Sequence, residues 1–254
     1  MRRLGARDLA ASAAALAALL ALWWAASHGG WLSPVFLPTP EATARSLAEG
    51  LVGGELASFS GHTLERMLLG FGLATVAGVA LGCAVGLSPV VRAWIGPTLE
   101  FVRPLPASAV MPLAIALLGL SDGMVLAVVA FGSMWPVLLA TVHGLAAVHE
   151  RLHEVARALE LGRGAFVLKI GLPNALPDIV AGMRLALTVS LIVSVVGEMI
   201  ASQPGLGQAI LLAARAFRAS ELFAGIALLG ALGLASNALL ALVERRLLAW
   251  QHPD

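Results

Sequence analysis

Long apolar stretches separated by short polar ones dominate the pattern of this chain. Six of these stretches cover residues 9–27, 63–87, 99–118, 124–148, 179–201 and 222–243. Each approaches the length of about 20 residues that a helix needs to cross the roughly 30 Å hydrocarbon core of a membrane. Because backbone inside lipid must satisfy its own hydrogen bonds, the pattern predicts an all-α, polytopic membrane protein with about six transmembrane helices.

One polar block, residues 149–173, interrupts this pattern near the middle of the chain. Its apolar residues recur three or four positions apart: Leu152, Val155, Leu159, Gly162 and Phe166. This spacing predicts one apolar stripe on an amphipathic helix. Glycines 162 and 164 should break the helix, and Pro173 should stop it. The block is therefore predicted to be a handle between two membrane spans, on which a soluble partner docks.

The composition agrees with a membrane class. The chain is 59% hydrophobic and only 12% charged, whereas soluble domains carry about 25% charged residues. A net charge of +1 argues against nucleic acid as a partner. The single cysteine, Cys83, cannot form an intramolecular disulfide and is interpreted as a small core residue.

The basic residues predict the orientation. With both chain ends in the cytoplasm, twelve basic residues fall inside and only four fall outside, namely Arg45, Arg66, Arg215 and Arg218. This bias follows the positive-inside rule. The handle is then cytoplasmic, and residues 29–62 and 202–221 face outward.

The first span has two interpretations. Arg2, Arg3 and Arg7 precede it, as in a secretory signal peptide, and Ala25-Ala26-Ser27 could end one. The stretch is long for a signal peptide, and three tryptophans near its end are typical of interfacial anchors: Trp23, Trp24 and Trp31. We favour an uncleaved anchor.

The spans contain candidates for packing and function. Gly78, Gly82 and Gly86 repeat every four residues, which predicts close helix packing. Four prolines indicate kinks or a cavity wall: Pro104, Pro106, Pro112 and Pro136. Glu198 is a functional candidate because it lies in a span, although its position near the outer end fits a solvated side chain equally well.

Two sequence motifs bear on whether the chain is a P-loop ATPase or a zinc metalloprotease. The only lysine, Lys169, is followed by Ile170, so the chain lacks the Lys-Ser or Lys-Thr of a P-loop, and an ATP motor would be another polypeptide. His149-Glu150-Arg151-Leu152-His153 matches the zinc signature H-E-x-x-H of metalloproteases.

The zinc pattern needs a third ligand. The distant candidates are Asp122, Asp178 and Glu198, none of which lies in a ligand motif. The polar surroundings favour solvated histidines on a docking helix. An intramembrane zinc protease remains an alternative, as does a secondary transporter, which would need intramembrane charge relays or matched broken spans.

Several motifs resemble one family. Residues 154–159 read Glu-Val-Ala-Arg-Ala-Leu, and residues 172–186 read Leu-Pro-Asn-Ala-Leu-Pro-Asp-Ile-Val-Ala-Gly-Met-Arg-Leu-Ala. Both are similar to the cytoplasmic E-A-A loop of permease subunits from binding-protein-dependent ABC importers. The nitrate/sulfonate/taurine branch is resembled by residues 103–115, by residues 197–202 followed by Gly205-Leu-Gly207, and by Leu37-Pro-Thr-Pro40 before the second span. Two departures are Val155 at the second position of E-A-A and Glu160 at the usual glycine, with Gly162 two places later.

The resemblance implies a domain plan and site residues. Residues 1–62 would hold a cytoplasmic tail, the first span and a periplasmic segment; residues 63–248 would form the permease core with its coupling loop at 149–176; and 249–254 would be a cytoplasmic tail. The implied ATPase-coupling residues are Glu154, Ala156, Leu159, Gly162, Phe166, Leu172 and Pro173. Residues of a possible translocation path are Arg103, Pro112 and Glu198.

The resemblance also implies the partners. A permease of this kind would sit in the bacterial inner membrane as a homodimer, with two ATPase subunits at the inner face and a periplasmic binding protein at the outer face. ATP-Mg would bind to the ATPase, so no catalytic residue, cofactor or metal is expected on this chain. The implied substrate is a small anion such as an alkanesulfonate, taurine or nitrate, although related permeases also serve pyrimidine-like vitamin precursors.

Overall fold

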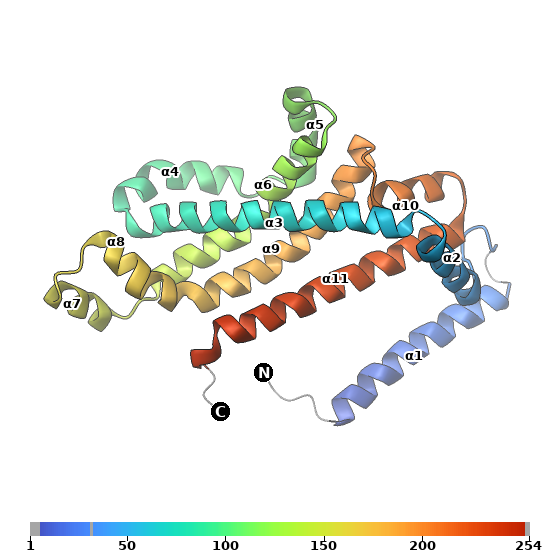
Figure 1. Ribbon diagram of the computed structural model, residues 1–254, viewed down its shortest axis with the longest axis horizontal. Coiled ribbons are helices and arrows are strands. Elements are labelled where there is room, and N and C mark those ends of the chain that lie inside the picture. The colour runs from blue at the N-terminus through green and yellow to red at the C-terminus, as the bar shows by residue number, and fades with distance from the viewer. Residues whose placement is uncertain (1–5, 31–32, 252–254) are drawn as a thin grey trace.

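The computed structural model describes residues 6–30 and 33–251, and all regular elements among them are helical (Figure 1). They are α1 (Ala6–His28), α2 (Pro40–Val52), α3 (Leu56–Leu87), α4 (Pro89–Val102), α5 (Ala107–Leu118), α6 (Asp122–Ala146), α7 (Glu150–Ala158), α8 (Arg163–Phe166), the π-helical turn η1 (Val167–Gly171), α9 (Leu172–Ala201), α10 (Leu206–Arg215), α11 (Ala219–Leu247) and the 3₁₀ turn η2 (Ala249–Gln251). The predicted anchor Trp31, the arginines Arg2 and Arg3 and the last residues of the predicted tail lie outside the described residues.

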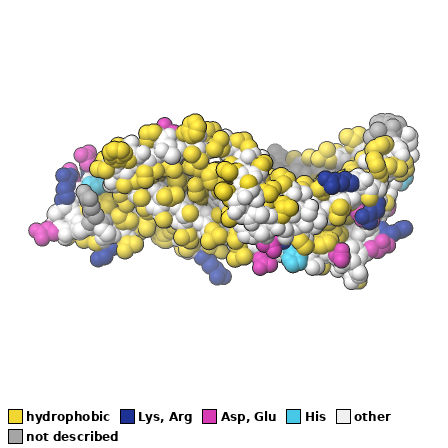
Figure 2. All heavy atoms as spheres, turned by 90° about the horizontal axis from the view of Figure 1, so that it is seen from above, with side chains coloured by type: hydrophobic (Ala, Val, Ile, Leu, Met, Phe, Trp, Pro, Cys, Tyr) yellow, Lys and Arg dark blue, Asp and Glu magenta, His cyan; other side chains and the backbone are white. Residues whose placement is uncertain are grey.

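The described helices confirm a polytopic membrane protein. Five helical segments are long and apolar enough to cross a membrane: 10–28 in α1, α3, α6, 164–201 across α8 and α9, and α11. The bent pair α4 and α5 makes a sixth if it is counted as one span. Figure 2 shows hydrophobic side chains over most of one face, with charged side chains gathered mainly toward the two ends.

The third predicted span is wrong as a single straight helix. Instead of one helix over residues 99–118, α4 and α5 meet at 99°. The break falls at the sequence Arg103-Pro104-Leu105-Pro106, where two prolines cannot donate the backbone hydrogen bonds that would continue α4. Pro106 then occupies the N-cap of α5, with an extended backbone (ψ 129°).

Helices α3, α6 and α9 form the core of the bundle, and α11 lies along it on the side that faces α1 (Figure 1). The glycine repeat of α3 confirms the predicted close packing. A Cβ atom at Gly78 would lie 2.9 Å from the backbone oxygen of Met134, and one at Gly82 would lie 2.6 Å from the Cβ of Thr141. Only glycine allows α3 and α6 to approach this closely.

The two ends of the bundle differ. The α7–α8 segment and the C-terminal end of α11 lie at one end, whereas α2 and α10 lie at the other (Figure 1). At the α2 end, Trp23 of α1 stacks on Phe223 of α11, with ring centroids 5.7 Å apart. The indole nitrogen of Trp23 also donates a hydrogen bond to the Pro38 carbonyl oxygen, 3.0 Å away. These contacts attach α1 to the rest of the chain mainly at this end.

Candidate functional site

In the structure, the predicted handle at residues 149–173 begins with one short helix, α7, whose outer face is exposed. His149 caps α7, its Nδ1 accepting a hydrogen bond from the Arg151 backbone N–H at 3.2 Å. Ala156 is the buried residue of α7, while Glu154 and Val155 are exposed. The prediction of one stripe running on to Leu159 and Phe166 is wrong, because α7 ends at Ala158 and Leu159 is 65% exposed.

Glu160 makes the turn that ends α7. Its φ is +50°, in the left-handed region that favours glycine. The Leu161 N–H donates to the Ala156 oxygen at 2.9 Å, and the Glu160 N–H donates to the Arg157 oxygen at 3.1 Å, the bond pattern of a Schellman motif. The turn has therefore not moved to Gly162, which lies outside the left-handed region and whose carbonyl oxygen instead starts α8 by accepting from the Phe166 N–H.

The prediction that Pro173 stops the helix is also wrong. The chain continues from α8 through η1 into α9, with Pro173 in the first turn of α9. At this point the Leu172 N–H donates to the Val167 oxygen, five residues back, so the turn is wider than an α-helical one. The wide turn accommodates a residue that has no N–H to donate. Leu172 packs against the buried cluster that contains Leu145, so the C-terminal end of the handle is anchored in the core.

The two histidines of the zinc pattern have structural partners. His149 is the helix cap, and the His153 ring stacks on Phe166 with centroids 4.8 Å apart and planes 26° from parallel. Within residues 6–30 and 33–251, no group of three His, Cys, Asp or Glu side chains could hold a metal ion. The geometry therefore supplies no third ligand for a protease site.

A cavity of about 900 Å³ separates the handle from the helix ends behind it. It lies between α7–α8 and the neighbouring ends of α3, α4 and α6, and its charged and aromatic walls include Arg92, Glu150, His153, Arg157 and Phe166. This space leaves α7 attached to the bundle mainly through its two flanking connections, to α6 and to α8.

At the opposite end, Glu198 is fully buried, so the interpretation as a solvated side chain is wrong. Its carboxylate accepts hydrogen bonds from Thr63 Oγ1 at 3.0 Å, from the Gly207 backbone N–H at 2.9 Å and from Arg66 Nη1 at 3.1 Å. Arg66, itself only 7% exposed, also donates to the Pro204 oxygen at 2.6 Å and to Asp122 Oδ1 at 2.6 and 2.9 Å. We call Thr63, Arg66, Asp122 and Glu198 the Arg66–Glu198 cluster.

The cluster fastens the loop before α10 to the bundle. Thr63 Oγ1 accepts from the Leu206 N–H at 2.9 Å, which joins α3 to this loop. A Cβ atom at Gly205 would lie 2.3 Å from Glu198 Cδ, and one at Gly207 would lie 2.2 Å from the Val195 oxygen. Glycine is therefore required at both positions for the backbone to reach the carboxylate.

Sequence reasoning missed Arg66 and Thr63 as site residues. In the predicted orientation, Arg66 counts only as one of the four basic residues on the outer side. The signal that could have found it is its position in an apolar stretch, where an ionised side chain needs a partner. Its partner Glu198 is 132 residues away, which no local pattern specifies.

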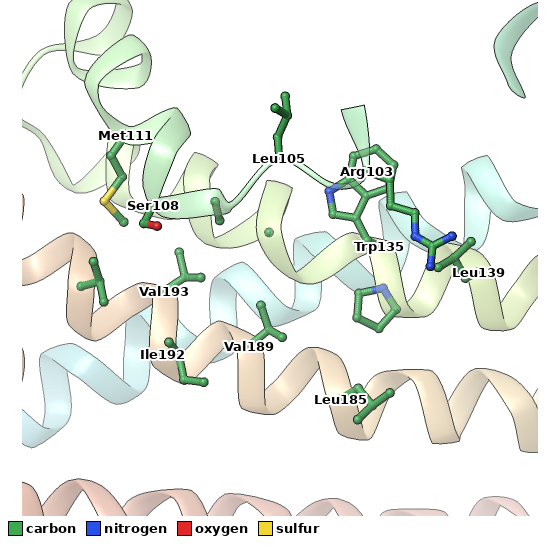
Figure 3. A pocket seen from close by; sticks show the side chains of 14 residues that line it. Arg103, Leu105, Ser108, Met111, Trp135, Leu139, Leu185, Val189, Ile192 and Val193 are labelled. Carbon is green, nitrogen blue, oxygen red and sulfur yellow. The ribbon is translucent and has the colours of Figure 1, made fainter. Parts of the chain in front are cut away.

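A pocket of about 550 Å³ lies at the bend between α4 and α5, against α6 and α9 (Figure 3). Of the three path candidates, only Arg103 lines it. Pro112 is exposed on α5 outside the pocket wall, and Glu198 belongs to the buried cluster. We call this space the bend pocket.

Comparison with known proteins connects these sites to a family. Residues 74–249 match the family described as binding-protein-dependent transport system inner membrane component. The chain is 32% identical to a putative aliphatic sulfonates transport permease protein of Bacillus subtilis, over 93% of this chain and 86% of the relative. It is 29% identical to the taurine transport system permease protein of Escherichia coli, over 96% and 90%. A nitrate import permease protein of Leptolyngbya laminosa is 30% identical over 72% of this chain and 66% of that protein.

Proposed function

The chain belongs to the family of inner membrane components of binding-protein-dependent transport systems, and from this premise we propose that it is the permease subunit of an ATP-driven importer of a small anion. The observation that carries the proposal is the α7 handle. It lies between two core helices, α6 and α9, and presents exposed apolar and charged residues at one end of the bundle.

The handle suits mechanical coupling to a partner ATPase. Leu152, Val155 and Leu159 expose apolar surface beside the Glu154 carboxylate, a combination that fits a groove with a basic rim. Movement of α7 would pass through the short turn at residues 159–162 into α8, and from there through η1 directly into α9. The ATPase would bind ATP-Mg, and this chain would supply the moving walls of the path.

The assembly we propose has two copies of this chain, two ATPase subunits and one periplasmic binding protein. Both chain ends and the handle would face the cytoplasm of a bacterium, and α2 and α10 would face the binding protein. ATP and the loaded binding protein would favour different access states, which couples hydrolysis to transport. The Arg66–Glu198 cluster would hold the outer end together during this change.

The names of the similar permeases support an alkanesulfonate, taurine or nitrate as the substrate. The test is uptake into proteoliposomes that contain this chain with an ATPase subunit and a binding protein from the same organism. We expect uptake of one of these anions that requires both ATP and the binding protein. Uptake driven by an ion gradient without the ATPase would instead indicate a secondary transporter.

A charge reversal in the handle tests the coupling role. Glu154→Lys should release the ATPase during purification and lower uptake at least about tenfold, the scale expected when a hydrogen-bonded charge at an interface is reversed. Glu49→Lys, the same change on the exposed surface of α2 at the opposite end, is the matched control for retention of the ATPase. Full retention of the ATPase by Glu154→Lys would contradict the docking role of α7.

A further inference from the structure

The bend pocket has one ionisable side chain in its wall, Arg103, and the remaining lining residues are neutral. It lies near the middle of the bundle, because its α6 wall extends from Gly132 to Leu139 and its α9 wall from Leu185 to Val196. Among the residues that the structure describes, no carboxylate lines it to neutralise the guanidinium. Arg103 is exposed at the bend of a predicted span, where an ionisable residue is a functional candidate by default, and it lines a space large enough for a small molecule.

Trp135 supplies a second donor to the same pocket. The side chain is only 7% exposed, and among the described residues its indole N–H has no hydrogen-bond partner. Phe131 holds the ring edge-on, at 89° with centroids 5.7 Å apart. Figure 3 shows the indole nitrogen on the side of Leu105 and Ser108, and the Arg103 guanidinium beside Leu139. A buried N–H without a partner is costly unless a bound group accepts from it.

The start of α5 adds a third source of positive potential. Pro106 is the N-cap of this 12-residue helix and provides no side-chain cap. Ala107 and Ser108, the first residues of α5, line the pocket. The free N–H groups and the dipole at a helix N-terminus attract anions, and the Ser108 hydroxyl can donate as well.

The remaining walls are apolar. Leu185, Val189 and Ile192 of α9 line the pocket on the side opposite α5 (Figure 3). The volume of about 550 Å³ lies in the range of small-molecule sites, which span roughly 300–1,000 Å³. An ion with an oxyanion head and a short hydrocarbon tail would satisfy the donors on one side and the apolar wall on the other.

We propose that the bend pocket is a transient binding site on the translocation path, in which Arg103, the Trp135 indole N–H and the start of α5 hold the oxyanion head of a short-chain organic acid. The inference rests on the proposed function and specifies where and how the anion is bound within the membrane. Because the Arg103 side chain is long and exposed, it is expected to turn toward the head group when the anion binds. The site should be weak, because a passing substrate must also leave.

Binding can be tested on the complex of this chain with its ATPase in nanodiscs of phosphatidylcholine. Saturation-transfer NMR would follow propanesulfonate, with propyltrimethylammonium as a cation of the same length. We expect saturable binding of propanesulfonate and no saturable binding of propyltrimethylammonium. Trp135→Phe, which keeps the ring and removes the N–H, should weaken it by about fivefold, and Arg103→Gln by about tenfold or more, as expected for neutral and charged hydrogen bonds.

Trp94→Phe is the matched control, because Trp94 lies on α4 and is 80% exposed, away from the bend pocket. Unchanged binding in both pocket variants, or no saturable binding at all, would overturn the proposal. A lipid phosphate offers the same oxyanion chemistry, so the experiment is repeated with phosphatidylglycerol. Loss of the sulfonate signal together with Arg103-dependent retention of that lipid would assign the pocket to lipid and reject a substrate site.

Uptake measurements separate this inference from the proposed function. If the native complex imports an anion with ATP and binding protein while both pocket variants transport normally, the permease function stands and the site fails. If the native complex imports none of the candidate anions, the proposed function itself fails. If the site is on the path, the variants should raise the substrate concentration needed for half-maximal uptake more than they change retention of the ATPase.

Discussion

Replacing Arg66 by methionine removes the one cation that faces the buried carboxylate of Glu198. The two side chains are 9% and 0% exposed, and Arg66 Nη1 lies 3.1 Å from Glu198 Oε1. Breaking a buried ion pair by removing one partner destabilises by about 3–5 kcal/mol, because the other charge stays buried without compensation. Thr63 and the Gly207 N–H still donate to Glu198, so the lower half of this range is expected.

The second ion pair of Arg66 provides an internal control. The Arg66 Nη2 atom is 2.6 Å from Asp122 Oδ1, but the Asp122 side chain is 68% exposed. Water and salt screen such a pair, and exposed pairs contribute about 0–1 kcal/mol. Asp122→Asn should therefore have a small effect despite the shorter distance. The contrast between Asp122→Asn and Arg66→Met tests whether burial, rather than distance, decides how much each ion pair stabilises the protein.

The single cysteine offers the assay. Cys83 is partly buried in α3 against the core cluster, so a thiol-reactive fluorogenic dye reports its exposure as the protein unfolds on heating. Arg66→Met should lower the apparent unfolding temperature by roughly 6–12 °C, from about 3 kcal/mol and about 2–4 °C per kcal/mol for chains of this size. Asp122→Asn should lower it by less than roughly 4 °C.

A double variant completes the test. Arg66→Met with Glu198→Gln leaves no buried charge in the cluster, since the remaining carboxylate, that of Asp122, is 68% exposed. The amide can still accept from Thr63 and from the Gly207 N–H. The double variant should unfold at a higher temperature than Arg66→Met alone. Equal effects of Arg66→Met and Asp122→Asn, or a double variant that is less stable than Arg66→Met, would refute the account of the cluster.

The turn after α7, the membrane orientation and the two histidines of the zinc pattern can each be tested. Glu160→Gly should raise the unfolding temperature by a few degrees, because a left-handed backbone costs a residue with a side chain about 1–2 kcal/mol. Glu160→Val should lower the unfolding temperature, because β-branched residues fit this backbone worst. Gly162→Ala should have no effect in the same dye assay, since an added Cβ there meets nothing within 4 Å. A reporter that is active only outside the cytoplasm should work when fused near Gln208 and fail at the C-terminus, and the reverse pattern would invert the proposed orientation. The double variant His149→Ala, His153→Ala should retain transport and purify without stoichiometric zinc, whereas loss of one tightly held zinc together with activity would revive the protease alternative.

The membrane class and the position of the handle could both be predicted from the amino-acid pattern. Both depend on local properties: runs of apolar residues long enough to span a membrane, and a polar block between two such runs. The glycine repeat from Gly78 to Gly86 predicted close packing for the same reason, because the absence of a side chain is a property of each position. The motifs at 154–159 and 197–207 also identified the family before any contact was known.

Three features could not be predicted from the sequence pattern. The partner of Glu198 lies 132 residues earlier in the chain, and only the packing of α3 against α9 brings Arg66 to it. The turn after α7 uses Glu160 although Gly162 is nearby, because the hydrogen bonds to Ala156 and Arg157 fix where the backbone must turn. The bend pocket exists because α5 turns away from α4 while α6 and α9 close its other side. The ion pair and the bend pocket depend on which distant segments meet, and the energies that select such contacts are not encoded in the periodicity of any single segment. The turn at Glu160 depends on local hydrogen bonds, which the preference of such turns for glycine does not predict.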